Sequence, residues 1–377
     1  MLKPVYLDHH ATTPVDPRVL EAMLPYFGAK FGNAASRTHS FGWEAEKAVD
    51  RARRQVAELA GADPREIVFT SGATESINLA IKGIPRKTDG GMVVVETEHR
   101  AVLDTVRHTQ RVSTLRVAPD GRIDLDTLRR AVEPQTVLVN VMYANNEIGV
   151  IQPIREVGAF CQERGIPFHC DAAQAFGKIP IDVRSDHIDL MSMTAHKLYG
   201  PKGVGALYVR RGLRLCAQID GGGHESGLRS GTLNVPGIVG FGEACAIAAQ
   251  EMAEESARIL RLRERLHAAL ANAIEDLRVN GSLEDRLAGN LNVTIPGVDA
   301  AALLTSLPDI AVSTGSACSS ATPEPSHVLR AIGLATRDAR SSIRFGLGRF
   351  NTEEEIDYAA ARVVECVRRL RSLAPIS

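Results

Sequence analysis

The sequence has no excess of either charge and few aromatic residues. It contains 44 Lys plus Arg against 45 Asp plus Glu, and only 5% of its residues are aromatic, with a single Trp. A chain this close to neutral produces no overall field that would attract nucleic acid or an anionic membrane. We therefore expect partners to be recognised locally, and we expect no direct binding of nucleic acid.

Long apolar runs are also missing. No stretch approaches the roughly 18 apolar residues that a membrane-spanning helix needs. The first residues, 1–8, contain neither the apolar segment of a signal peptide nor an Arg-rich amphipathic stretch. The sequence therefore predicts a soluble, cytoplasmic protein without a membrane partner.

Cysteines are few and widely spaced. The six lie at positions 161, 170, 216, 245, 318 and 366, without any C-x-x-C pair. This spacing indicates neither a zinc site nor a disulfide framework, so we expect no metal. Five of them fall in helical or strand patterns, where cysteine is usually a small buried hydrophobe. Cys318 differs, because residues 313–325 are small or turn-forming and predict an exposed, flexible loop.

The 377 residues predict two domains. Up to about residue 250, short apolar runs alternate with helical patterns, which is typical of a mostly parallel sheet covered by helices on both faces. The expected strands are 66–70, 92–95, 136–142, 167–169, 189–193 and 205–209, and the expected helices include 44–60 and 153–164. The large domain is predicted to span 13–252.

The remaining chain predicts a small α+β domain made of residues 1–12 and 253–377. A long helix after about residue 250 would place Leu262, Leu266, Ile274 and Leu277 on its apolar face. A second long helix would begin near Thr352, which forms a plausible capping box with Glu355. This domain would carry the Cys318 loop, at about 313–326.

Two polar residues directly follow apolar strands. Asp171 comes after the run 166–170, and Lys197 comes shortly after the run 189–193 and before a Gly/Pro-rich turn. Taken alone, Asp171 would be a turn former and Lys197 a solvated surface residue. Ligands of parallel sheets, however, bind at the carboxyl ends of strands. A pyridoxal cofactor needs both groups, an amine to bind covalently and a carboxylate for its ring nitrogen.

A third segment, 70–75, predicts a strand, a turn at Gly72 and the start of a helix. Gly72 lets the backbone approach an anion closely, and the first N–H groups of a helix attract phosphate. Many α/β turns look alike, so this segment gains weight only beside Asp171 and Lys197.

With these motifs the chain resembles the NifS/IscS-type cysteine desulfurases, which are class V aminotransferase-like enzymes. The resemblance extends over essentially the whole chain. The matching segments are 6–8, 11–14, 70–75, 97–99, 145–149, 171–174, 194–203, 229–232, 315–318 and 342–345.

The resemblance implies a fold, a cofactor and a set of site residues. The fold would be α/β, that of a fold-type I pyridoxal-phosphate-dependent transferase, with a mostly parallel seven-stranded sheet between helices and a smaller α+β domain. Pyridoxal 5'-phosphate would be held by Lys197 covalently, Asp171 at the ring nitrogen, Gln174 at the phenolic oxygen, His99 on the ring face, and Ala73, Thr74, Thr194, His196 and Thr232 at the phosphate. Thr232 would come from the second subunit of a homodimer, while Arg344 and Asn145 would bind the substrate carboxylate.

The resemblance also implies the reaction. Cys318 would attack the thiol of L-cysteine, leaving L-alanine and a persulfide on the enzyme, with His99 moving protons. The length of the Cys318 loop resembles the IscS-like branch of the family. The sulfur would serve iron–sulfur cluster assembly through a scaffold protein, or tRNA and cofactor thiolation, and the sequence leaves the acceptor open.

Two other functions are compatible with parts of this pattern. Another class V enzyme, such as a selenocysteine lyase or a small-molecule aminotransferase, would share the fold without depending on Cys318. A catalytically silent interaction module would need none of Lys197, Asp171, His99 and Cys318. The pair His9-His10 is assigned no role.

Overall fold

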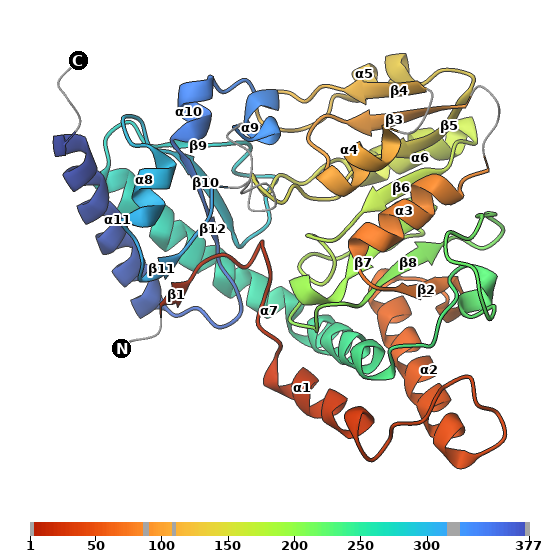
Figure 1. The fold of residues 1–377 in the computed structure, drawn as a ribbon. Helices are drawn as coiled ribbons and strands as arrows, with labels where there is room; N and C mark the ends of the chain where they lie inside the picture. The colour runs from red at the N-terminus through yellow and green to blue at the C-terminus, as the bar shows by residue number, and fades with distance from the viewer. Residues whose placement is uncertain (1–3, 86–89, 108–110, 315–324, 374–377) are drawn as a thin grey trace.

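The computed structural model describes residues 4–85, 90–107, 111–314 and 325–373 (Figure 1). Its largest feature is a seven-stranded sheet. From one edge to the other the strands are β2 (Ile67–Thr70), β8 (Gly205–Val209), β7 (Leu190–Thr194), β6 (Phe168–Asp171), β5 (Thr136–Asn140), β3 (Gly91–Val95) and β4 (Arg111–Leu115). Strand β8 runs opposite to the other six strands, so both of its pairings are antiparallel and the remaining four are parallel. The predicted α/β class with a mostly parallel seven-stranded sheet is therefore confirmed.

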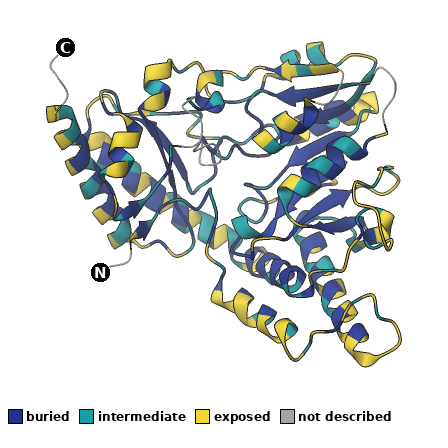
Figure 2. Cartoon of the chain, in the orientation of Figure 1, coloured by how far each residue is buried: buried dark blue, intermediate teal, exposed yellow. Residues whose placement is uncertain are grey.

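Helices cover both faces of this sheet. On β3, Met92 and Val94 pack with α3 (Ala73–Gly83) and α4 (Arg100–Val106), whereas Val93 and Val95 belong to the core on the opposite face. That second face is covered by α2 (Ser40–Ala60), α5 (Leu125–Ala131), α6 (Ile154–Arg164) and the first half of α7 (Val235–Ala273). The central strands are buried on both sides (Figure 2), which explains their continuous apolar runs.

Helix α7 corrects the predicted start of the long helix. It begins at Val235, not near residue 250, and it ends at Ala273, so Ile274 and Leu277 lie beyond its end. Its first half contributes to the core of the large sheet and its second half, from Ile259, to a separate core. The first half is buried and rich in small residues on several sides, so it lacks the one-sided apolar stripe by which an amphipathic helix is predicted.

The second core gathers around smaller sheets and the last helix. A three-stranded antiparallel sheet has the order β12 (Ser342–Gly346), β10 (Asn290–Thr294) and β9 (Arg278–Val279), and β1 (Val5–Tyr6) pairs with β11 (Ile310–Ala311). The short helices here are α8 (Ala300–Thr305), α9 (His327–Ala331) and α10 (Thr336–Arg340), and the long one is α11 (Glu353–Leu373). Val5 and Leu7 of the N-terminal segment are buried in this second core.

Two local predictions can be compared directly. The capping box is confirmed, because Glu355 N–H donates to Thr352 Oγ1 (3.2 Å) and Thr352 N–H donates to Glu355 Oε2 (3.3 Å). The prediction that all five remaining cysteines lie in helices or strands is wrong for Cys216. This residue is exposed in a loop, where its N–H donates to Gly83 O (2.7 Å). Its apolar neighbours Leu213 and Leu215 alternate as in a strand, but they form no strand and pack against the core that contains α3.

None of the helices in the described part of the chain combines the length and the apolar character needed to cross a bilayer. Helix α1 (Pro17–Met23) lies at the lower edge of the view; its Val19 and Met23 are buried in the core of the large sheet, and its outer side is exposed (Figure 2).

Candidate active site

A cavity of about 610 Å³ lies at the carboxyl edge of the large sheet. It brings together nine of the residues predicted for the site, namely Ala73, Thr74, His99, Asp171, Gln174, Thr194, His196, Lys197 and Arg344. These come from five separate segments of the chain, and Arg344 is contributed by strand β12 of the smaller sheet. Asn145 and Thr232 do not line the cavity, and Cys318 lies outside the described residues.

Asp171 and Lys197 are placed by neighbouring parallel strands. Strand β6 ends at Asp171, which is in register with Ser192 of β7. Strand β7 ends at Thr194, and a single 3₁₀ turn, Ala195–Lys197, then brings the lysine to the cavity. Both side chains thus face the same space, as parallel strands with a common carboxyl edge require.

The N-terminal segment lies against the 3₁₀ turn that carries Lys197, here called the lysine turn. The Lys197 amine donates to the backbone carbonyls of His10 and Ala11, the latter at 2.8 Å. Thr13 ties the same turn down, since its N–H donates to His196 O (3.0 Å) and its Oγ1 accepts from Tyr199 N–H (2.9 Å). Residues far apart in sequence therefore fix the position of Lys197.

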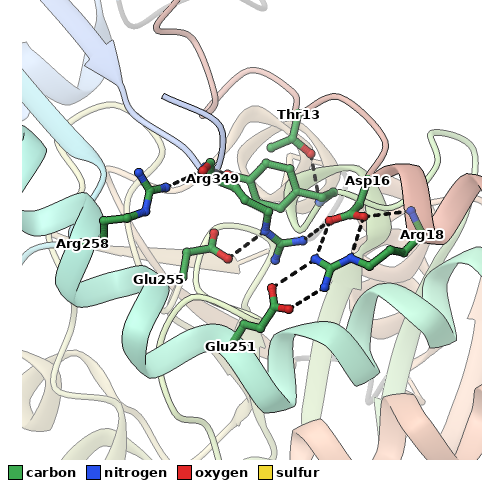
Figure 3. A network of polar contacts seen from close by, with 8 residues as sticks. Thr13, Asp16, Arg18, Glu251, Glu255, Arg258 and Arg349 are labelled. Atoms are coloured by element: carbon green, nitrogen blue, oxygen red, sulfur yellow. Dashed lines mark hydrogen bonds and ion pairs between the residues drawn. The ribbon is translucent and has the colours of Figure 1, made fainter. Parts of the chain in front are cut away.

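A polar network supports this turn from below (Figure 3). The Arg349 guanidinium lies 4.3 Å from the centre of the Tyr199 ring and forms ion pairs with Asp16 (2.7 Å) and with Glu255 of α7 (2.8 Å). Asp16 also pairs with Arg18 at 2.8 Å. These partners connect the N-terminal segment, α7 and the loop after β12, so the lysine turn is anchored to both cores.

Asp171 is buried beside a second carboxyl group. Its Oδ1 accepts from Ala173 N–H (3.0 Å), and burial raises the pKa of Asp171. Glu98, only 1% exposed, accepts from Met142 N–H (2.6 Å), and its Oε2 has no hydrogen-bond partner among the described residues. Burial and the nearby Asp171 charge hold the pKa of Glu98 well above its usual range, so its neutral form is favoured. Sequence reasoning missed Glu98, although it stands in the quoted segment 97–99.

Gln174 is held on the cavity wall by two neighbours. Its Nε2 donates to His10 O (3.0 Å), and its Oε1 lies 2.9 Å from His10 Nδ1 and accepts from the Lys178 amine at 3.4 Å. Burial, followed by the charge of Lys197, lowers the pKa of Lys178 to about 7. Neither His10 nor Lys178 was assigned a role from the sequence.

His99 begins helix α4 and faces the cavity. Its Nδ1 accepts from Ala101 N–H (3.1 Å), which caps the first turn. Because that lone pair is in use, the neutral ring carries its hydrogen on Nε2. In this neutral form Nε2–H is the hydrogen-bond donor of the His99 ring.

The opposite end of the cavity suits an anion. Helix α3 begins at Ala73 after Gly72, whose φ of +152° is one that side-chain-bearing residues rarely adopt, and no side chain caps this helix. Its first N–H groups therefore remain to meet a ligand. Thr194, His196 and Lys202 line the same region. Burial, followed by the charge of Lys197, lowers the pKa of His196 to about 4, so it acts as a neutral hydrogen-bonding group.

Arg344 lies in the middle of buried strand β12 and is only 2% exposed. Its two terminal nitrogens pair with Asp8 Oδ1 and donate to Asn146 O, both at 2.7 Å. Its Nε has no partner among the described residues. The guanidinium thus faces the cavity already oriented.

Asn145 is fully buried behind that wall. Its Nδ2 donates to Thr97 O (2.9 Å), and its Oδ1 accepts from the N–H groups of Glu147 (2.8 Å) and Ile148 (3.0 Å). It therefore shapes the turn that presents Asn146, and binding of substrate by Asn145 stays a prediction. The same holds for Thr232, which is exposed.

The described end of the Cys318 loop reaches the cavity. Pro325, Ser326 and His327 line it. Ser326 Oγ donates to Glu147 Oε2 (2.5 Å), and His327 Nε2 lies 3.0 Å from Glu98 O. The chain therefore re-enters the described structure at the cavity itself.

The residues present fit pyridoxal phosphate. The cavity joins an uncapped helix start for the phosphate, a buried carboxylate for the ring nitrogen and a lysine amine for the aldehyde. Two polar atoms without partners in the described structure, His10 Nε2 and Arg344 Nε, belong to residues that line this cavity. Unpartnered buried polar atoms are costly, so a polar ligand would satisfy them.

Comparison with known proteins gives the same family. Residues 5–359 match the aminotransferase class-V model. The chain is 56% identical over 382 aligned positions to "Cysteine desulfurase IscS" of Anaeromyxobacter dehalogenans, covering 99% of this chain and 95% of that protein. A solved "NIFS-LIKE PROTEIN" is 38% identical, with a TM-score of 0.91 over 97% of this chain and 100% of that one. "SspA in complex with cysteine" is 37% identical, with a TM-score of 0.82 over 92% of this chain and 100% of that one. The chain belongs to the aminotransferase class-V family.

Proposed function

We propose that this protein is a pyridoxal-phosphate-dependent cysteine desulfurase, which converts L-cysteine to L-alanine and transfers the sulfur to its own Cys318. The observation that carries the proposal is the convergence of Lys197, Asp171 and Arg344 on one cavity. The substrate follows from the relatives, one of which is named a cysteine desulfurase at 56% identity and another of which is solved with cysteine.

When bound, pyridoxal phosphate supplies a ring that accepts the electron pair left at the substrate α-carbon. The Lys197 amine would hold the cofactor and the Asp171 carboxylate would keep its ring nitrogen protonated. At about 3 Å and an effective dielectric constant near 20, such a charge pair is worth roughly 5 kcal/mol before desolvation. Gln174 would bind the phenolic oxygen, and His99 would stack on the ring.

The phosphate would be held at the start of α3 by Ala73 and Thr74, with Thr194 and His196 beside them. The substrate carboxylate would bind Arg344, whose planar fork suits two parallel hydrogen bonds, and Asn145 would support it. Asp8 orients the guanidinium at 2.7 Å, which reduces the entropy lost when substrate binds.

Cys318 would take the sulfur. Its thiolate forms the S–S bond to the substrate sulfur while the substrate C–S bond breaks, and the bonding pair stays with the carbon skeleton. That skeleton takes up protons and leaves as alanine, while the sulfur remains as a persulfide. His99, which lines the cavity, would be the residue that moves protons to and from the substrate.

The two cores are proposed to be the two domains, 13–252 and 1–12 with 253–377. Helix α7 contributes to both cores, so it would be the rigid connection between the domains. The cavity, lined by residues of both, would lie at their interface, a common place for small-molecule sites.

We also propose a homodimer with shared active sites. Thr232 lies away from its own cavity, as a residue donated to a partner would. Large apolar side chains between α1 and the start of α2 are at least 47% exposed, an arrangement typical of a protein interface. They are Leu20, Leu24, Phe27, Phe31, Phe41 and Trp43.

The sulfur acceptor is proposed to be an iron–sulfur scaffold or a tRNA-thiolation protein in the cytoplasm. A persulfide must pass its outer sulfur to another thiol or nucleophile, so an acceptor that reaches the cavity mouth is required. Pull-down from native cytosol after loading with cysteine would identify it.

The decisive experiment compares two single-cysteine variants of the holoenzyme. Cys318→Ala should abolish alanine and sulfide formation from L-cysteine while the protein stays yellow. The matched control Cys216→Ala removes the exposed thiol outside the cavity and should keep full turnover. In wild-type protein, mass spectrometry should find one added sulfur atom on Cys318.

Undiminished turnover by Cys318→Ala would rule out the persulfide step and favour another class V reaction. A colourless protein that takes up no pyridoxal phosphate would favour a catalytically silent module.

A further inference from the structure

His10 occupies the cavity wall without a role in the site described so far. It follows β1 and Asp8, it is only 3% exposed, and it lines the cavity beside Gln174 and Lys197. Its ring could simply fill space, but its hydrogen bonds determine which of its nitrogen atoms carries hydrogen.

The backbone determines the orientation of Gln174. A carbonyl oxygen can only accept, so the Gln174 atom 3.0 Å from His10 O must be the amide nitrogen. The other amide atom, Oε1, therefore faces His10 Nδ1 at 2.9 Å. An amide oxygen can only accept, so Nδ1 carries the hydrogen and donates it.

This tautomer leaves a lone pair on Nε2. That atom is buried and has no hydrogen-bond partner in the described part of the chain. Burial and the charges of Lys178, Arg344 and Lys197 hold the pKa of His10 well below its usual range, while Gln174 opposes this. The ring therefore remains neutral, and Nε2 is an acceptor without a donor.

The donor can be inferred from Lys197. Its amine donates to His10 O and Ala11 O, so the reacting amine of this enzyme lies beside residue 10. A substrate whose carboxylate binds Arg344 would place its own amine near the position of the Lys197 amine. We propose that His10 Nε2 accepts a hydrogen bond from the α-amino group of the bound amino acid. The inference rests on the proposed function, because it requires Lys197 and Arg344 to act as described there.

His10 would thereby select ligands that carry an α-amino group. Arg344 recognises only the carboxylate, which cysteine shares with simple carboxylic acids. A neutral acceptor beside the amine should favour binding of an amino acid over its deaminated analogue. With the analogue bound, the buried acceptor has no donor, so the free-energy cost of removing it from water is not offset.

Three holoenzyme variants test this, each with two ligands. L-Alanine binding is followed by the absorbance change of the cofactor, and 3-mercaptopropionate, which lacks the amine, by its inhibition constant. His10→Asn keeps a donor near the Nδ1 position but removes the acceptor. His10→Gln places an amide oxygen near the Nε2 position but loses the bond to Gln174. His9→Asn is the control, because His9 is also buried and its Nδ1 has no partner among the residues that the structure describes, but it does not line the cavity.

We expect His10→Asn to weaken L-alanine binding about tenfold and 3-mercaptopropionate binding less than about twofold. His10→Gln should retain L-alanine binding within about threefold, and His9→Asn should change neither ligand by more than about twofold. Bound cofactor and thermal unfolding show that each variant is folded.

Equal effects of His10→Asn on the two ligands, or none on either, would overturn the inference. So would a tenfold loss of L-alanine binding in His10→Gln, which checks the same point if His10→Asn does not fold. If wild-type holoenzyme gives no response to L-alanine, the proposed active site itself fails. A wild-type response with an unchanged His10→Asn variant refutes only the role of His10.

Discussion

The two walls of the cavity are built differently. On the large sheet, Asp171 and Lys197 follow neighbouring parallel strands, β6 and β7, so the sheet edge itself brings them together. On the other wall, Arg344 lies within strand β12 and is oriented by Asp8, which comes from the N-terminal segment. The position of the proposed reacting groups thus depends on local chain geometry, whereas the position of the charge proposed to bind substrate depends on segments that are distant in sequence.

This difference predicts how each wall fails when it is changed. A substitution on the sheet wall should remove chemistry and leave substrate binding largely intact. A substitution on the other wall should weaken binding first, because its groups orient substrate without forming bonds to it.

The largest effect is expected for Lys197→Ala. Removing the amine proposed to hold the cofactor should lower kcat for alanine formation at least about 10⁴-fold. Lys202→Ala is the matched control on the same wall and should cost less than about tenfold. Equal losses in the two variants would show that positive charge, not the specific amine, matters.

The next largest effect on kcat is expected at Asp171, and it should distinguish this residue from the second buried carboxyl group, Glu98. Asp171→Asn should lower kcat about 10³-fold, because a neutral amide stabilises a protonated ring nitrogen poorly. Glu98→Gln should lower kcat less than about threefold, because burial already favours the neutral form of Glu98. Steady-state kinetics with L-cysteine measure both, and comparable losses would contradict this division of roles.

On the opposite wall, Arg344→Lys should raise KM for L-cysteine about 100-fold while kcat falls less than about tenfold. Asp8→Asn should raise KM about tenfold, because Arg344 keeps its bond to Asn146 O at 2.7 Å but loses its ion pair. A change confined to kcat in either variant would place Arg344 among the reacting groups instead.

The smallest effect concerns stability and pH. The pKa of Lys178 is lowered to about 7 from 10.5, so the folded protein binds fewer protons than the unfolded chain between these values. Stability therefore rises with pH in this window. From pH 7 to 9 wild type should gain about 2 kcal/mol over Lys178→Met, measured by urea unfolding. If the free energies of unfolding of the two proteins change in parallel with pH, the pKa of Lys178 is not lowered in the folded protein.

The same difference between the walls explains what the sequence could predict. Strand β8 was expected at its observed residues, 205–209, because a strand buried on both faces is a continuous apolar run between turns. Asp171 and Lys197 were recognisable because each follows such a run. Helix α7 was predicted too short, since its first half is buried without a one-sided pattern.

Arg344, in contrast, was assigned to the site only through the family resemblance, because an arginine inside a strand has no local signal of function. His10 and Glu98 were missed for the same physical reason. Their roles depend on hydrogen bonds and burial created by segments far away in sequence, as in the 164-residue separation between His10 and Gln174. Such pairings are a property of the folded chain, not of a motif.

The most direct test of the account is to locate the cofactor. Holoenzyme reduced with borohydride fixes pyridoxal phosphate to the amine that holds it, and peptide mass spectrometry then identifies that residue. We predict the modification on Lys197 alone. Modification of Lys178 or Lys202 instead would show that the amine beside Asp171 is not the reacting group, and the proposed chemistry of this cavity would be wrong.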